Sequence, residues 1–165
     1  MLIFAKGSKM KQETNRGFSL IELLIVVTII GIIASIAIPN LLASRRAANE
    51  GSAQQSLRTI ASCETTYLFT EGAGSYTDLP GLGAKTLTDS VLASGSKSGY
   101  TFVAVTQGGL TPLYWAYAVP TTTSGFAKTG TRRFAIAEDG VLRHDSNLIA
   151  PANEAEVRLM SPSGN

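Results

Sequence analysis

Apolar residues dominate one long, uninterrupted stretch near the beginning of the chain. Between Gly17 and Arg45 the only charged residue is Glu22. A helix over residues 18–42 would be about 37 Å long at 1.5 Å per residue, which is enough to span a bilayer. Because the segment is apolar on every side rather than along one stripe, we expect it to lie in lipid or among other apolar helices.

The helical pattern continues over residues 43–71, where it becomes amphipathic. This part contains no proline, and its apolar positions recur at helical spacing. The stripe consists of Leu57, Ile60, Ala61, Glu64 and Leu68. We expect the helix to pack this stripe against a globular domain and to end near Gly72.

Two residues weaken the apolar part of the helix. Pro39 lacks a backbone donor and crowds the preceding turn, and Gly31 has a low helix propensity. The segment between them is therefore expected to carry either a fixed kink or a local loosening of the helix.

Residues 72–99 are rich in glycine, serine and threonine, which predicts a connector loop with one short helix at 89–93. Strand-like composition follows in residues 100–106, 113–119, 132–137 and 141–144. Asp139-Gly140 predicts a hairpin turn between the last two strands. The tail, residues 145–165, is expected to be coil with a brief helical or extended piece at 154–160.

These elements predict an α+β fold, in which the carboxy-terminal half of a long helix packs on an antiparallel sheet of about four strands spanning residues 100–144. On the second strand Leu113, Trp115, Tyr117 and Val119 share one face. We expect Trp115 and Phe134 to cover Leu57, Ile60 and Leu68.

Glu22 is the anomaly of the apolar segment, because a carboxylate at membrane depth normally needs a cationic partner. If the chain were cut after Gly17, the new amino group of Phe18 would supply one, either within a chain or between neighbouring chains. Pairing between chains would set their axial register, since an unpaired buried charge costs several kcal/mol. The alternative is that Glu22 lies at the membrane interface, in the favourable first turn of a helix.

The sequence Gly17-Phe18-Ser19-Leu20-Ile21-Glu22, with the apolar run, Gly31 and Pro39-Asn40 behind it, resembles the amino terminus of type IV pilins and of type II secretion pseudopilins. The resemblance is close over residues 11–50 and rests on architecture beyond them. It implies cleavage between Gly17 and Phe18 by a prepilin peptidase and N-methylation of Phe18. It also implies assembly into a helical homo-oligomeric filament by an inner-membrane platform, with Glu22 paired to the Phe18 amine of an adjacent subunit. Loosening between Gly31 and Pro39 in the filament is a further implication.

Charge supports a division into a leader (residues 1–17), a transmembrane or filament-core helix (18–42) and a globular domain (43–165). The leader carries four basic residues and one acidic residue, whereas the rest carries ten basic and eleven acidic residues. The excess positive charge therefore belongs to the leader, and no direct nucleic-acid binding is predicted. By the positive-inside rule, the leader is expected in the cytoplasm and the carboxy-terminal part across the membrane, although Arg45 and Arg46 weaken the asymmetry. The resemblance implies that this membrane is the bacterial inner membrane, where the chain contacts lipid before assembly into a surface pilus or periplasmic pseudopilus.

Two other interpretations of the apolar segment remain open. Ser35-Ile36-Ala37 offers a conventional secretory cleavage site, which would release a soluble protein that starts at Ile38. An uncut chain would instead be a single-span anchor. Beside the pilus subunit and its pseudopilin variant, a membrane-anchored or secreted binding domain that does not polymerise is thus a second class of function.

Catalytic chemistry is not predicted. His144 and Cys63 are the only histidine and the only cysteine, which excludes an intrachain disulfide and a multi-histidine metal site. No enzyme activity and no cofactor are expected, and Cys63 is expected to be a partly buried apolar residue. Glu138, Asp139, Asp145 and Asn147 supply oxygen atoms, but their order does not match a calcium loop, so Asp139 and Asp145 are weak calcium candidates and turn residues are favoured.

Overall fold

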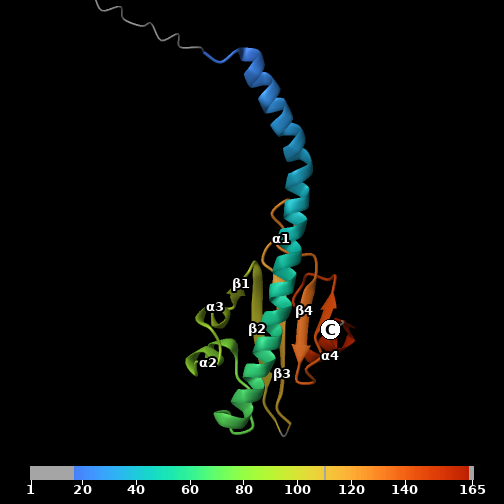
Figure 1. The fold of residues 1–165 in the computed structure, drawn as a ribbon. Coiled ribbons are helices and arrows are strands. Elements are labelled where there is room, and N and C mark those ends of the chain that lie inside the picture. Colours follow the sequence, from blue (N-terminus) through green and yellow to red (C-terminus); the bar gives the residue numbers. More distant parts are fainter. Residues whose placement is uncertain (1–16, 110, 164–165) are drawn as a thin grey trace, which may run out of the picture. The chain divides into compact units, whose positions relative to one another are not determined.

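The computed structural model describes residues 17–109 and 111–163. The predicted leader therefore lies outside the described residues, apart from Gly17. The chain divides into two compact units, residues 1–38 and 39–165, which are described separately. Figure 1 shows the elements of both.

Helix α1 (Leu20–Thr70) supplies the apolar segment and continues into the second unit. It remains helical across Pro39. It ends close to Gly72, as expected: the N–H of Gly72 donates to the carbonyl of Tyr67 at 2.7 Å, and the next two residues, Ala73 (φ +46°) and Gly74 (φ +84°), have left-handed backbone conformations. The predicted long helix is confirmed.

The connector between α1 and the sheet is more ordered than the predicted loop. It contains α2 (Leu79–Ala84), α3 (Ser90–Ala93) and the short strand β1 (Ser96–Lys97). Helix α3 confirms the helix expected at 89–93, with Asp89 as its N-cap. Helix α2 was not predicted, because its two glycines hide the signal; it is held by the Asp78 cap and by the buried Leu79 and Leu82.

The sheet is antiparallel and has six strands in the order β1-β2-β3-β4-β5-β6. The others are β2 (Tyr100–Gln107), β3 (Leu113–Pro120), β4 (Arg133–Ala137), β5 (Arg143–Asp145) and β6 (Ser161–Pro162). The predicted four strands correspond to β2–β5, and the count was low because β1 and β6 have only two residues each. Gly140 has φ +71° at the β4–β5 turn, which confirms the Asp-Gly hairpin.

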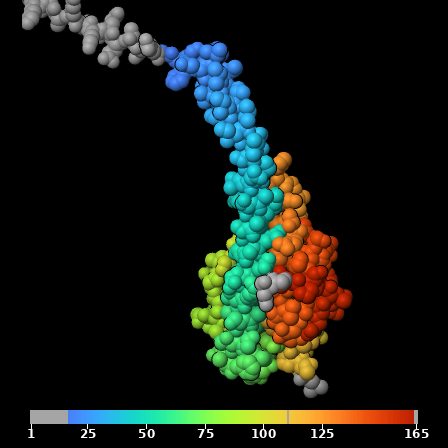
Figure 2. Space-filling view, turned by 45° about the vertical axis from the view of Figure 1, so that its right-hand side comes forward, coloured from blue at the N-terminus to red at the C-terminus, as the bar shows by residue number. Residues whose placement is uncertain are grey.

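One face of the sheet packs on the second half of α1. Figure 2 shows this half of the helix, in green, between the connector and the carboxy-terminal part of the domain. The core on this side contains Leu57 and Ile60 of α1, Phe134 of β4, and the small residues Ala116 and Ala118 of β3. Leu68 is only half-buried.

Trp115 corrects the predicted assignment of faces. The alternation along β3 was right, but Trp115 belongs to a second core on the opposite face, with Ala135, Ala137, Val157 and Met160. Here α4 (Glu154–Leu159) covers the sheet. On β3 the residues that face α1 are Ala116 and Ala118, whose small side chains let the helix lie close to this strand, whereas the indole packs on the other face.

Candidate functional site

The candidate functional site is the amino-terminal segment, which comprises Phe18 and α1 as far as Leu42. From Leu20 to Leu41 every large apolar side chain is exposed, and Phe18 is 86% exposed. An 18-residue window of this helix has a mean hydropathy of 2.8, with no residue of the window buried. The helix is thus long and apolar enough to cross a membrane, and a surface of this size marks an interaction with lipid or protein.

Glu22 lies in the first turn of α1, and its side chain caps the amino-terminal end of the helix. One of its carboxylate oxygens, Oε2, accepts the backbone N–H of Ser19 at 2.9 Å. Leu23 donates its N–H to the carbonyl of Ser19 at 3.2 Å. The bond to the Ser19 N–H is the glutamate half of a capping box, and the negative charge also suits the positive end of the helix dipole. The structure therefore gives Glu22 an intrachain role, and its pairing with Phe18 of another chain stays a prediction.

Two hydroxyl groups of the apolar segment are satisfied within the helix. The hydroxyl of Thr28 donates to the carbonyl of Leu24, and that of Ser35 donates to the carbonyl of Ile32, each at 2.7 Å. Such bonds make a hydroxyl tolerable in an apolar environment. Pro39 has no N–H to offer the carbonyl four residues earlier, so the ladder is weakened there. Flexibility between Gly31 and Pro39 stays a prediction.

Glu50 fixes α1 to the loop before β4. Its Oε1 accepts hydrogen bonds from the N–H and the hydroxyl of Thr131 at 2.8 and 2.7 Å. Its Oε2 accepts hydrogen bonds from Nε and Nη2 of Arg132 at 3.0 and 2.7 Å. Burial by itself raises the pKa of Glu50, but the bonds from Thr131 and Arg132 outweigh it and lower the pKa below its usual value. A charged Glu50 thus holds the helix in the domain.

Arg133 is almost fully buried and gathers the carboxy-terminal segment around β4. Its Nη2 donates to Asp145 at 3.0 Å and to Glu156 at 2.7 Å, and its Nη1 donates to the carbonyl of Ile149 at 2.6 Å. The guanidinium therefore joins β4, β5 and α4.

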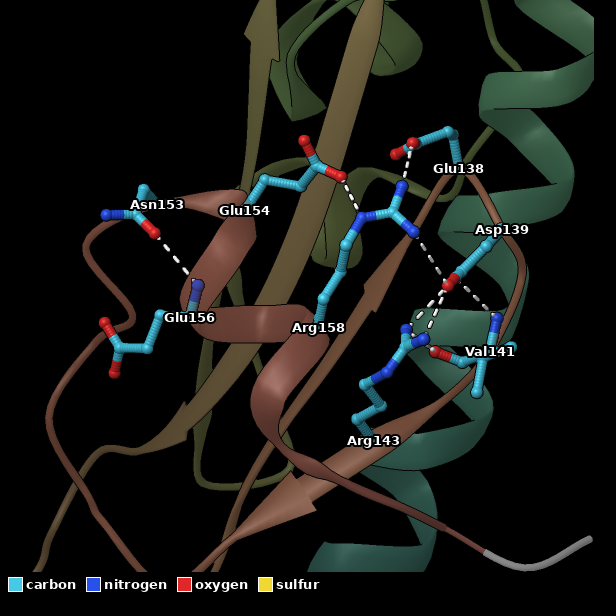
Figure 3. Close-up of polar contacts among 8 residues, drawn as sticks. All are labelled: Glu138, Asp139, Val141, Arg143, Asn153, Glu154, Glu156 and Arg158. Atoms are coloured by element: carbon cyan, nitrogen blue, oxygen red, sulfur yellow. Dashed lines mark hydrogen bonds and ion pairs between the residues drawn. The ribbon is translucent and has the colours of Figure 1, made fainter.

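The calcium candidates Asp139 and Asp145 lie at opposite ends of the β4–β5 hairpin. Asp145 is opposite Arg133 at the start of β4, whereas Asp139 lies in the turn after Ala137. Asp139 accepts hydrogen bonds from Arg143 and Arg158, as Figure 3 shows. The structure does not bring the two carboxylates together, and each already has arginine partners. Within residues 17–109 and 111–163, no three acidic, cysteine or histidine side chains are grouped so that they could share a metal ion.

The remaining candidates lie in packing positions. Cys63 is buried, as predicted, and its thiol donates to the carbonyl of Leu87. His144 is on β5, with its ring 6.4 Å from that of Phe134 between centroids.

Glu64 is a buried carboxylate that sequence reasoning treated only as part of the apolar stripe. It is 0% exposed; Oε2 accepts the N–H of Thr77 at 3.2 Å, and Oε1 has no hydrogen-bond partner in the described residues. Burial is the main cause that raises the pKa of Glu64; the bond from Thr77 lowers the pKa and the nearby charge of Asp78 raises it, so that it lies at about 7. Glu50, Leu57 and Glu64 recur every seven residues on one side of the helix, which is the signal that could have indicated two buried carboxylates.

Glu64→Gln is expected to stabilise the domain at neutral pH. Because the native pKa of Glu64 is above its unfolded value, the native state binds more protons, and stability falls as pH rises from about 4.5 to about 7. The glutamine variant should lack this fall and gain up to about 3 kcal/mol in the free energy of unfolding at pH 8. Urea titrations of the full chain in detergent, followed by the fluorescence of the single Trp115, would measure it.

Glu50→Gln is the matched control, since the same substitution removes a carboxylate whose pKa is lowered rather than raised. Its charge stabilises the domain above the unfolded pKa, and this contribution is lost as pH falls. The variant should therefore lose about 2 kcal/mol at neutral pH. Equal effects of the two substitutions at pH 8 would contradict the different roles assigned to the two residues.

Comparison with known proteins identifies the family to which the chain belongs. Residues 14–38 match the family model described as the prokaryotic N-terminal methylation motif. The chain is 37% identical over 123 residues to the type IV wide pilus major component PilA4 of Thermus thermophilus, an alignment that covers 70% of this chain and 88% of the relative.

Two further relatives match over shorter lengths. The type IV major pilin PilA of Myxococcus xanthus is 43% identical over 53 residues (32% of this chain, 24% of the relative). The type II secretion system core protein G of Klebsiella michiganensis is 42% identical over 36 residues (22% and 25%). No solved structure matches significantly. With a methylation motif that includes the start of the exposed apolar helix, and a long alignment to a pilin, the chain belongs to the type IV pilin family.

Proposed function

We propose that this chain is a structural subunit of a type IV pilus, made as a precursor, cleaved between Gly17 and Phe18 and assembled through the apolar part of α1. The observation that carries the proposal is the exposed apolar helix, whose first part lies within the matched methylation motif at residues 14–38. The long alignment to a pilus component favours the pilus over a secretion pseudopilus, whose relative matches over 36 residues.

The same apolar surface serves twice in this proposal. Before assembly it holds the subunit in the inner membrane, with the basic leader in the cytoplasm, and afterwards it is covered by the helices of neighbouring subunits. A prepilin peptidase, which cuts the leader and methylates Phe18, and an inner-membrane assembly platform are the implied partners. Gly17 is accessible to a protease on the described side, because no atom of the described residues lies within 4 Å of the position of its missing side chain.

Glu22 links the two uses. Cleavage would give Phe18 an amino group one residue before the Ser19 N–H that Glu22 already binds. In a filament of displaced helices, the amine of an adjacent subunit would meet the carboxylate in an apolar environment, where an unpaired charge costs several kcal/mol. The charge pair would thereby select one axial register.

The experiment that tests the proposal is to determine the amino-terminal residue and intact mass of the chain recovered from membranes. A start at Phe18 with one added methyl group is expected. A start at Ile38 would mean a secreted soluble domain, and a start at Met1 an uncut anchor; either result would overturn the proposal. Gly17→Val is the control, which should leave the leader attached without disturbing the fold.

The kind of filament is tested separately. Sheared surface filaments that contain the chain would support the pilus, whereas loss of protein secretion on deletion, without surface filaments, would support a pseudopilus. If neither result were obtained, a membrane-anchored binding domain that does not polymerise would be supported instead.

A further inference from the structure

The loop between β3 and β4, residues 121–131, carries an exposed aromatic residue and a cation beside the carboxy-terminal end of the apolar segment. Phe126 is 87% exposed, and with Lys128 it lines an open hollow shared with Leu42, Arg45 and Asn49 of α1. In Figure 1 this loop, in orange, lies next to the helix. The tip of the loop is thus at the level where apolar residues give way to the first arginines.

The base of the loop is fixed, so its tip is held at this level. Asn49 donates its side-chain N–H to the carbonyl of Thr129 at 3.0 Å, and Glu50 accepts two bonds from Thr131. Across the loop, Thr129 donates its N–H to the carbonyl of Thr122 at 2.9 Å. The tip, residues 123–128, lies outside these bonds.

The surface around the tip is cationic and without acidic residues. Residues 40–49 and 121–131 contain no aspartate or glutamate, but they contain Arg45, Arg46 and Lys128. None of these three cations is in an ion pair within the described part of the chain. Both arginines lie on the side of α1 that carries Leu42 and Asn49, by their spacing along the helix.

We propose that the tip of the 121–131 loop, together with Arg45 and Arg46, binds anionic phospholipid headgroups at the surface of the membrane that the apolar segment spans. An apolar ring flanked by cations suits the boundary between headgroups and acyl chains. The patch is continuous with the apolar segment, which ends at Leu42, and this continuity identifies lipid as the occupant. The inference rests on the proposed membrane-spanning state of the subunit before assembly.

The loop would give the unassembled subunit a second hold on the membrane. A single helix lets the domain rotate and tilt, whereas a second contact beside the helix restricts both motions. Extraction into a filament would then require release of the loop as well as of the helix. Each basic residue near an anionic surface contributes about 1 kcal/mol, which is about fivefold in the binding equilibrium at low salt.

The test uses the full chain in vesicles of phosphatidylcholine, with or without phosphatidylglycerol. A nitroxide is attached at Ser124→Cys, beside Phe126 in the exposed tip, in a Cys63→Ser background that keeps a donor for the Leu87 carbonyl. The relaxation of the label by bilayer-dissolved oxygen and by a water-soluble nickel chelate reports its depth. The control label is at Thr70→Cys, at the far end of α1.

With phosphatidylglycerol present, the label at position 124 should be relaxed more by oxygen than by the nickel chelate. The label at position 70 should be relaxed more by the nickel chelate than by oxygen. Lys128→Gln should lower the ratio of membrane-bound to free loop about fivefold, and Phe126→Ser should also lower it. Added salt should weaken the effect.

Other outcomes separate the inference from the proposed function. If the label at position 124 stays in water in both kinds of vesicle while the chain resists alkaline extraction, the lipid contact is wrong and the membrane-spanning state stands. If the chain is extracted by alkali, the proposed function itself fails. If the label becomes shielded only in assembled filaments, the occupant is a neighbouring subunit, which also overturns the lipid proposal.

Discussion

Arg133→Met is expected to lower the free energy of unfolding of the domain by about 3 kcal/mol. The arginine is 2% exposed and is the common partner of Asp145, Glu156 and the carbonyl of Ile149. Removing one member of a buried ion pair typically costs 3–5 kcal/mol, and the lower end applies because both carboxylates are 35% exposed and regain some hydration. Urea unfolding of the full chain in detergent measures the loss.

The fluorescence of Trp115 is a suitable probe for this variant. The indole lies in the core beneath α4, with Val157 and Met160, and Arg133 holds α4 in place through Glu156. Loosening of α4 should therefore shift the emission toward that of a hydrated indole before the rest of the domain unfolds.

Arg158→Met is the matched control, because the same substitution is made on α4 itself. Arg158 pairs with Glu138, Asp139 and Glu154 (Figure 3), but its side chain is 43% exposed. Exposed ion pairs contribute little to stability because solvent screens them, so this variant should be near neutral. If the two variants lost equal stability, burial of Arg133 would not be what makes its ion pairs important.

The sequence predicted the parts of the fold that depend on local pattern. The long helix follows from an apolar run and a stripe at helical spacing. The hairpin was predictable from Asp139-Gly140, because its turn needs a residue with positive φ and glycine adopts this conformation most easily. These features need no knowledge of what lies across the domain.

The features that were missed depend on contacts between distant residues. Alternation places Trp115 and Ala116 on opposite faces of β3, but which face meets α1 is decided by how closely the helix approaches. Glu50 pairs with Arg132 across 82 positions of the chain, so its helical spacing could indicate that it is buried but not which residue is its partner. A strand of two residues such as β6 is too short for any period to appear.

Replacing Glu22 tests whether its charge or its hydrogen bond serves assembly. Glutamine at this position keeps an oxygen that can accept the Ser19 N–H and is equally suited to a capping box, whereas alanine removes both oxygen and charge. If Glu22 pairs with an amine of an adjacent subunit, Glu22→Gln and Glu22→Ala should both lower the amount of chain in sheared filaments at least tenfold. The reason is that an unpaired buried charge costs several kcal/mol and each 1.4 kcal/mol is tenfold.

Membrane insertion and cleavage provide the control within the same cells. Neither variant removes apolar surface, and loss of a carboxylate makes entry into lipid less costly, so both should be found in membranes in normal amounts with Phe18 as the first residue. Filaments lost with alanine but kept with glutamine would assign Glu22 to the helix cap seen in the structure. Normal filaments from both variants would show that neither the charge nor the cap is needed, and axial register would then have to come from the packing of the apolar side chains alone.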